Sequence, residues 1–199
     1  MKIGKIKIGL NHKPCIIAEV SGNHNKKLKN ALKLVEVAAN AGADMVKLQT
    51  YTPDTITLKS NKKDFLIEDK KSLWKNQNLY NLFKKGFTPW EWHPAIFKKA
   101  KKLGITCFSS VFDETSVDFL EKLNVPAYKI ASFESTHYPL IKRVIKTKKP
   151  IIISVGLSSL KEINELVKFL RKNKCKNFAL LKCTSAYPAK PTDSNVKTI

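Results

Sequence analysis

The stretch AYKIASFE, from Ala127 to Glu134, decides the fold of this chain. Its apolar residues predict a buried strand, and Lys129 lies in the middle of that strand. A lysine inside an apolar strand is costly unless an anionic or hydrogen-bonding group meets its ammonium. The stretch therefore predicts either a functional cation in a buried sheet or a lysine at a sheet edge whose ammonium reaches water.

Two further apolar stretches also carry a charged residue. MVKLQTY contains Lys47, and IIAEVSGNHN contains Glu19. Three charged residues on three short apolar strands indicate a polar site at the strand ends. Two lysines, several hydroxyl groups and a neighbouring carboxylate suit a phosphate ligand.

Strand and helix patterns alternate about six times along the chain. Nearly continuous apolar strands of this kind are typical of a parallel α/β architecture. A TIM barrel needs eight strand–helix units and about 250 residues, so we expect an incomplete TIM barrel of about six units. A doubly wound sheet is the alternative, although no GxGxxG motif follows the first strand. We expect one helix to begin at TPWE, with Thr88 as the N-cap of a capping box, and another at SLKE, with Ser159.

Composition and charge limit the function classes. The 199 residues are 43% hydrophobic, with no run of about 18 apolar residues, and the first ten lack the apolar core of a signal peptide. We therefore expect a cytoplasmic protein without a membrane partner. Its four cysteines form no CxxC pair, which favours buried thiols.

The formal net charge of +21 raises nucleic-acid binding as an alternative. Arg143 and Arg171 are the only arginines, however, and the lysines are scattered over most polar stretches. Base readout and bidentate phosphate contacts usually depend on arginine. The charge therefore favours solvated lysine-rich faces and an anionic small substrate over a nucleic acid.

A series of motifs resembles a known family. IAEVSGNHN, VKLQTYTPDT, TPWEWH, FSSVFDETSVDFLE, PAYKIASFE, KPIIISVGLSSLKEI and LKCTSAYPA occur in the order found in the sialic-acid synthases. The resemblance covers nearly all of residues 1–199, and the variants SGNHN, QTYTPDT and ASFE look most like the pseudaminic acid branch. It implies that residues 1–199 are the N-terminal part of a TIM barrel, without the last barrel units and a small C-terminal domain.

The resemblance also implies a reaction. Phosphoenolpyruvate condenses with an open-chain amino sugar, a 6-deoxy diacetamido hexose, and the products are a nonulosonic acid of the pseudaminic type and phosphate. Glu19 matches the catalytic acid/base carboxylate. The matching phosphoenolpyruvate-binding residues are Lys47, Ser110, Lys129, Ser132 and Ser154, and the matching sugar-binding residues are Gln49, Ser185 and Tyr187.

The chain departs from the family in its metal site. The family uses a divalent metal, Mn or Mg, and nothing here matches its two histidine ligands, which lie in later strands. We therefore expect no metal ligands in these 199 residues, little activity from them alone and a tendency to aggregate. A homodimer is expected only where the C-terminal domain is present. Alternatives are an N-acetylneuraminate or legionaminate synthase, a truncated inactive fragment, or a phosphoenolpyruvate-binding module.

Overall fold

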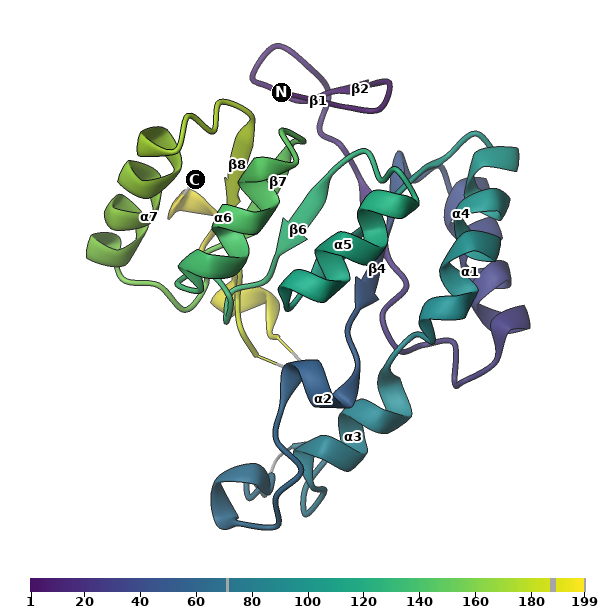
Figure 1. The fold of residues 1–199 in the computed structure, drawn as a ribbon, viewed down its shortest axis with the longest axis vertical. Coiled ribbons are helices and arrows are strands. Elements are labelled where there is room, and N and C mark those ends of the chain that lie inside the picture. Colours follow the sequence, from purple (N-terminus) through teal and green to yellow (C-terminus); the bar gives the residue numbers. More distant parts are fainter. Residues whose placement is uncertain (71, 187–188, 199) are drawn as a thin grey trace. The chain divides into compact units, whose positions relative to one another are not determined.

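The computed structural model describes residues 1–70, 72–186 and 189–198, and its elements alternate between strand and helix (Figure 1). The strands are β1 (Lys2–Ile3), β2 (Ile6–Lys7), β3 (Ile17–Glu19), β4 (Met45–Thr50), β5 (Thr106–Val111), β6 (Tyr128–Ile130), β7 (Ile151–Ser154) and β8 (Phe178–Leu181). The α-helices are α1 (Leu28–Asn40), α2 (Pro53–Ile56), α3 (Leu79–Gly86), α4 (His93–Lys102), α5 (Glu114–Lys122), α6 (Tyr138–Lys146) and α7 (Leu160–Lys172). Short 3-10 turns are η1 (Lys63–Phe65), η2 (Trp90–Trp92), η3 (Pro191–Ser194) and η4 (Val196–Thr198).

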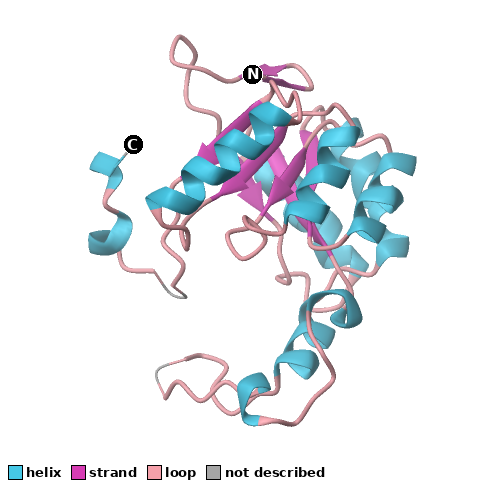
Figure 2. Cartoon of the chain, turned by 60° about the vertical axis from the view of Figure 1, so that its left-hand side comes forward, coloured by secondary structure: helices cyan, strands magenta, loops and turns pink. Residues whose placement is uncertain are grey.

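The main sheet has the strand order β3-β4-β5-β6-β7-β8, which is the order of the chain. Its strands are drawn in magenta and the helices in cyan in Figure 2. Consecutive parallel strands joined through helices are the arrangement of a TIM barrel, so the α/β prediction is confirmed. The chain divides into two compact units. The internal unit is Cys15–Ser109, and the terminal unit combines Met1–Pro14 with Ser110–Ile199.

The core of the internal unit forms where α1 and α4 pack on the strands. β3 and β4 pair in parallel with Glu19 opposite Lys47, and apolar residues from both helices cover them. The α1 sequence LKNALKLVEVAAN brings apolar side chains to one face of the helix at 3.6-residue spacing. The buried cluster comprises Val20, Ala31, Val35, Val46, Leu48, Ile96, Ala100, Ile105 and Cys107.

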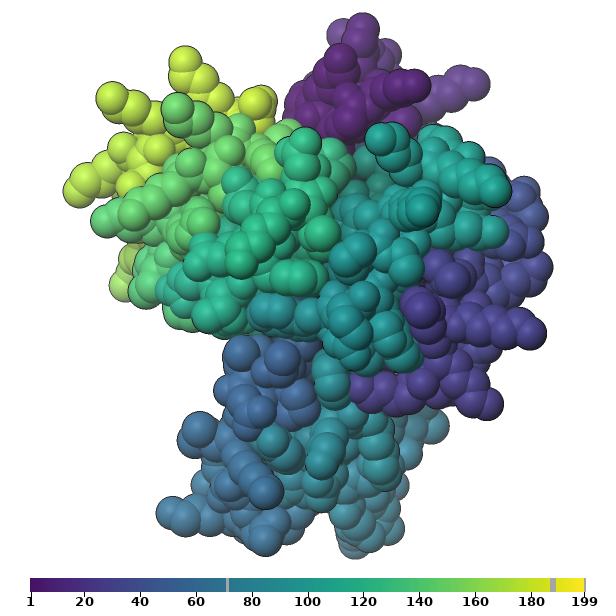
Figure 3. Space-filling model, turned by 45° about the vertical axis from the view of Figure 1, so that its right-hand side comes forward, coloured from purple at the N-terminus to yellow at the C-terminus, as the bar shows by residue number. Residues whose placement is uncertain are grey.

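The long segment between β4 and α4 is partly ordered by α2 and α3. These helices pack on each other, and they lie within the blue to teal lower part of Figure 3. Tyr80 Oη donates to Asp54 at 3.0 Å, and the rings of Tyr51 and Phe83 meet edge to face with centroids 5.8 Å apart. The sequence predicts a short helix over residues 78–85, which α3 confirms, whereas it predicts no helix at the position of α2.

The capping box predicted at TPWE is wrong. α4 begins at His93, after the 3-10 turn η2, and no side chain caps it. The hydroxyl of Thr88 instead lies 3.1 Å from Nε2 of His24. A buried partner from another element has displaced the local cap, because a buried histidine needs its nitrogens hydrogen-bonded.

The terminal unit contains the hairpin β1–β2 and the parallel strands β6, β7 and β8. Asp113 accepts a hydrogen bond from the backbone N–H of Thr115 at the start of α5. Ser159 and Glu162 form a complete capping box at the start of α7, as the sequence predicts. β6 is shorter than the strand predicted over AYKIASFE.

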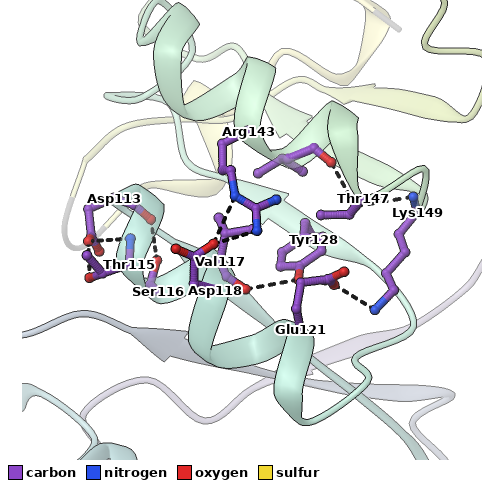
Figure 4. A network of polar contacts seen from close by, with 11 residues as sticks. Asp113, Thr115, Ser116, Val117, Asp118, Glu121, Tyr128, Arg143, Thr147 and Lys149 are labelled. Atoms are coloured by element: carbon purple, nitrogen blue, oxygen red, sulfur yellow. Dashed lines mark hydrogen bonds and ion pairs between the residues drawn. The ribbon is translucent and has the colours of Figure 1, made fainter.

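A polar network joins β6 to α5 and to the C-terminal end of α6 with the segment that follows it (Figure 4). Tyr128 Oη donates to Glu121 Oε1 at 2.6 Å, and Lys149 Nζ lies 2.7 Å from the same oxygen. Arg143 Nε donates to Asp118 at 2.9 Å. Burial raises the pKa of Tyr128, as does its bond to Glu121, so the phenol remains a donor in this network.

The turn after β7 requires a glycine at position 156. An added Cβ at Gly156 would lie 2.6 Å from the carbonyl oxygen of Cys183 and 2.8 Å from its Cβ. Both contacts are shorter than any that a real Cβ makes, so the segment after β8 approaches the backbone too closely for a side chain.

We expect Gly156→Ala to lower the free energy of unfolding by about 1–3 kcal/mol, because the methyl group forces the two segments apart. Urea denaturation measures the loss. Gly9→Ala is the matched control, since its added methyl would meet only a His12 ring carbon at 3.8 Å. Equal effects of the two substitutions would contradict the close packing at Gly156.

Candidate functional site

In the terminal unit, Lys129 is a buried cation. Its side chain rises from the middle of β6, and the residue is 7% exposed. The Lys129 ammonium donates to the carbonyl of Ile130 at 2.6 Å and to the hydroxyl of Ser154 at the end of β7. The alternative of an edge lysine in water is therefore wrong. An ammonium that donates hydrogen bonds near the ends of two strands is a group that suits the binding of an anion such as phosphate.

Hydroxyl groups surround the ends of β6 and β7. The backbone N–H of Gly156 donates to Ser132 Oγ at 3.3 Å. Ser135 Oγ donates to the carbonyl of Ser132 at 2.8 Å and lies 2.9 Å from Ser158 Oγ. The structure thus brings Lys129, Ser132 and Ser154 to the carboxyl ends of neighbouring parallel strands. Hydroxyls, backbone N–H groups and an ammonium are the donors that phosphate oxygens accept.

Glu134 adds a carboxyl group that the predicted site set did not include. Burial raises its pKa to about 7, against the opposing effects of its own backbone N–H and of Lys129. Its Oε2 is buried and has no hydrogen-bond partner among the described residues. A carboxyl that titrates near neutral pH can both give and accept a proton. Its place at the end of the strand that carries Lys129 was the available sequence signal.

Three other predicted residues belong to the terminal unit. Ser110 is buried in β5, with 2% exposure. Ser185 is exposed in the segment after β8, where the neighbouring Thr184 hydroxyl accepts from Lys182 at 3.0 Å. Tyr187 lies outside the described residues.

In the internal unit, the ends of β3 and β4 bring together Glu19, Lys47 and Gln49. Glu19 and Lys47 are directly opposite in register and form an ion pair. Ser21 links the group, because its backbone N–H donates to Glu19 at 3.3 Å and its hydroxyl donates to Gln49 Oε1 at 3.2 Å. The Lys47 side chain is 13% exposed and that of Glu19 is 41% exposed. Ser21 was absent from the predicted set, since a serine in a turn is a weak signal.

The buried histidines of the internal unit are fully engaged. His24 Nδ1 accepts from the Lys26 backbone N–H at 3.1 Å, so its Nε2 donates to Thr88. His93 Nδ1 donates to the Pro89 carbonyl at 3.3 Å, so its Nε2 accepts from the Thr50 hydroxyl at 2.9 Å. Burial lowers the pKa of both, to about 4 for His93, so both rings are neutral at pH 7.

The described residues offer no set of ligands that fits the divalent metal implied by the resemblance to sialic-acid synthases. Residues 1–70, 72–186 and 189–198 contain no cluster of three or more histidine, cysteine or acidic side chains that could hold a metal ion. Both nitrogens of His24 and of His93 are already bonded. His93 is 0% exposed and is packed in the interior of the internal unit. None of the helices in the described residues is long and apolar enough to cross a membrane.

Comparison with models of protein families shows to which family the chain belongs. The family model described as the NeuB family matches residues 34–199. The chain belongs to the NeuB family. The motif resemblance to sialic-acid synthases is therefore confirmed at the level of the family.

Two curated relatives of the chain come from one strain of Campylobacter jejuni, serotype O:2. Its pseudaminic acid synthase is 43% identical over 199 residues, which are 100% of this chain and 57% of that protein. Its N,N'-diacetyllegionaminic acid synthase is 37% identical over 190 residues, which are 94% of this chain and 56% of that protein. The chain thus spans little more than half the length of these relatives.

A solved structure of this family has the same fold. The crystal structure of N-acetylneuraminic acid synthetase from Leptospira borgpetersenii, in complex with citrate, matches with a TM-score of 0.84 and 29% identity. The match covers 100% of this chain and 64% of that one. Together with the strand order, this match confirms the prediction of an incomplete TIM barrel.

We expect Glu134 to make stability fall as the pH rises. Its pKa is raised to about 7 in the folded chain from about 4.5 in the unfolded chain, so the folded state holds the extra proton between these values. The free energy of unfolding of the wild type, minus that of Glu134→Gln, should drop by about 2 kcal/mol between pH 4.5 and pH 7.5, allowing for the partial exposure of Glu134. Chemical denaturation at several pH values measures it. Parallel pH curves for the two proteins would rule out the raised pKa.

His93 should act in the opposite direction. Its folded pKa of about 4 lies below the ordinary 6.5, so the unfolded chain takes up the proton first as the pH falls. The stability advantage of the wild type over His93→Gln should therefore shrink by about 3 kcal/mol from pH 7 to pH 4. The same denaturation series measures it, and an advantage that is constant with pH would count against the buried neutral ring.

Proposed function

We propose that the protein containing this chain condenses phosphoenolpyruvate with an open-chain 6-deoxy diacetamido hexose to form pseudaminic acid and phosphate. The observation that carries the proposal is the 43% identity to a pseudaminic acid synthase over all 199 residues. In this reaction C3 of phosphoenolpyruvate bonds to the aldehyde carbon of the sugar, water adds at C2, and phosphate leaves with cleavage of its bond to C2.

Lys129, Ser132 and Ser154 bind the phosphate group of phosphoenolpyruvate. The ammonium of Lys129 is buried, and it lies with the two hydroxyls at the ends of β6 and β7. Electrostatic stabilisation is strong in such a place, because little water screens it. By resemblance, Lys47 and Ser110 contact the same substrate.

Glu19 and Glu134 are the two carboxyl groups that carry protons. Glu19, by resemblance, is the acid/base group, and Lys47 balances its charge in the absence of substrate. Glu134 has a pKa near 7, which suits a group that must exchange a proton at neutral pH. We assign it to the proton transfers that accompany addition of water and loss of phosphate.

Gln49, Ser185 and Tyr187 are the proposed sugar contacts, with Gln49 held by Ser21. The choice of sugar rests on identity, which is 43% to the pseudaminic acid synthase and 37% to the legionaminic acid synthase of one strain. Legionaminate or N-acetylneuraminate synthesis is the second candidate. The metal of the family would polarise the sugar aldehyde when bound, but no step is assigned to it because these residues do not supply its ligands.

Residues 1–199 represent, in this proposal, the N-terminal part of the barrel of a longer enzyme. The relatives are nearly twice as long. By resemblance, the metal ligands belong to later strands of the longer enzyme. We propose that this longer enzyme forms a homodimer and is located in the cytoplasm. The 199-residue chain alone is expected to bind phosphoenolpyruvate with little turnover.

Phosphate release from phosphoenolpyruvate tests the proposal, with the longer enzyme and a panel of open-chain sugars. The 6-deoxy diacetamido hexose that leads to pseudaminic acid should give the highest kcat/KM. Glu19→Gln should lower kcat by about 100-fold or more, as expected for loss of an acid/base group. Glu36→Gln is the matched control, because that glutamate pairs with Lys33 and Lys99 on helix surfaces.

A preference for the legionaminate or neuraminate precursor would select the second candidate. Equal losses in Glu19→Gln and Glu36→Gln would contradict the role of Glu19. The absence of phosphate release with every sugar would contradict the synthase function as a whole.

A further inference from the structure

Lysines also gather around a pocket that no step of the proposed reaction uses. The pocket has a volume of about 530 Å³ and lies where α6 and α7 end and the chain turns toward β7 and β8. Six of its ten lining residues are lysine, whereas only 37 of the 199 residues of the chain are lysine or arginine. We call this the lysine pocket. Its lysines are Lys142, Lys146, Lys148, Lys149, Lys174 and Lys176.

The lysine pocket is distinct from the candidate site of the terminal unit. Its lining residues precede β7 and β8, whereas Ser132 and Ser154 follow β6 or end β7. β6, β7 and β8 are parallel, so residues before a strand and residues at its carboxyl end lie at opposite ends of the sheet. A ligand of the lysine pocket is therefore a second ligand.

The charge of the lysine pocket is poorly compensated. Only Lys149 has an ion pair with a described residue, to Glu121 at 2.7 Å, and none of the lining residues is acidic. Lysines often occur at helix ends because they offset the helix dipole. Two helix ends supply about one negative charge in total. The other five lysines exceed that amount, so dipole compensation does not account for them.

Two turns of the lysine pocket have a lysine in a backbone conformation that other residue types adopt more easily. Five helices are followed, two residues after their last residue, by a residue with positive φ. Glycine or asparagine, which suit this conformation, follow α1, α4 and α5. At the lysine pocket the residues are Lys148, with φ of 60°, and Lys174, with φ of 57°. Lysine is less favourable than glycine or asparagine in this conformation, so backbone preference does not explain a lysine at either turn.

We propose that the lysine pocket binds a small polyanion that carries two or more linked phosphate groups. Its volume is that of a site for a small molecule, which excludes enclosure of a polymer. Lysine acts as a mobile point charge toward phosphate, and the absence of arginine from the lining argues against planar bidentate recognition of a carboxylate. One monoanion would leave most of the charge uncompensated, whereas a linked polyphosphate matches it.

Inorganic tripolyphosphate is the probe, titrated by calorimetry into the chain at 150 mM salt. We expect saturable binding at one equivalent and at least tenfold weaker binding of orthophosphate. Lys148→Gly with Lys174→Gly should weaken tripolyphosphate binding about tenfold and raise the melting temperature by about 2–4 °C per substitution. The two effects have opposite signs because glycine adopts this conformation more easily and removes the charge.

Matched variants separate binding in the lysine pocket from a general effect of charge, of turn geometry or of the candidate site. Lys98→Gln with Lys102→Gln removes the same charge from the exposed face of α4. Asn124→Gly changes the backbone of the matching turn after α5. Neither variant should alter tripolyphosphate binding. Lys129→Met should also retain tripolyphosphate binding, because it affects the candidate site. Lys142→Gln with Lys146→Gln should weaken binding as the glycine variant does, without changing a turn.

Equal weakening by the α4 control would show a general charge effect and overturn the proposal. Loss of binding in Lys129→Met alone would place tripolyphosphate at the candidate site and overturn it as well. Binding of oligonucleotides that grows with their length, with no saturable tripolyphosphate site, would point instead to a polymer on the surface. Unchanged binding in the Lys148→Gly and Lys174→Gly variant would equally reject the pocket.

Discussion

The buried ammonium of Lys129 constrains the rest of the terminal unit. A charge in an apolar strand survives only where acceptors are fixed around it. Lys129 is opposite Ile152 in register, so Ser154, two residues further along β7, comes within reach of the ammonium. The carbonyl of Ile130 supplies the second acceptor. The register of β6 and β7 thus decides whether the lysine is tolerated.

The opposite face of β6 keeps that strand in place. Side chains alternate along a strand, so Tyr128 points away from Lys129, toward α5 and the end of α6. Its bond to Glu121, which also pairs with Lys149, ties β6 to its covering helices. Beyond β7, Gly156 allows the segment around Cys183 to approach closely. Packing on both sides therefore holds a buried cation whose charge suits an anionic ligand.

Much of the grouping of the site residues was predictable from the sequence, because residues at the carboxyl ends of parallel strands meet at one edge of the sheet. Lys129 with Ser154, and Glu19 with Lys47, followed from that rule. The prediction of Thr88 as a helix cap failed because its hydroxyl instead bonds to His24, a buried histidine 64 residues away. No local sequence pattern reveals such a partner. Ser21 and Glu134 were missed for a related reason. Their roles depend on burial and on partners set by the fold, and neither is visible in residue type alone.

The most direct measurement is the stability of the wild type and of Lys129→Met, with and without phosphoenolpyruvate. If Lys129 is kept for an anion, the variant without ligand should be at least as stable as the wild type, since methionine suits an apolar strand. Phosphoenolpyruvate should then raise the melting temperature of the wild type only. A strongly destabilised variant that the ligand still stabilises would mean that Lys129 serves the fold rather than the substrate, and would contradict the account.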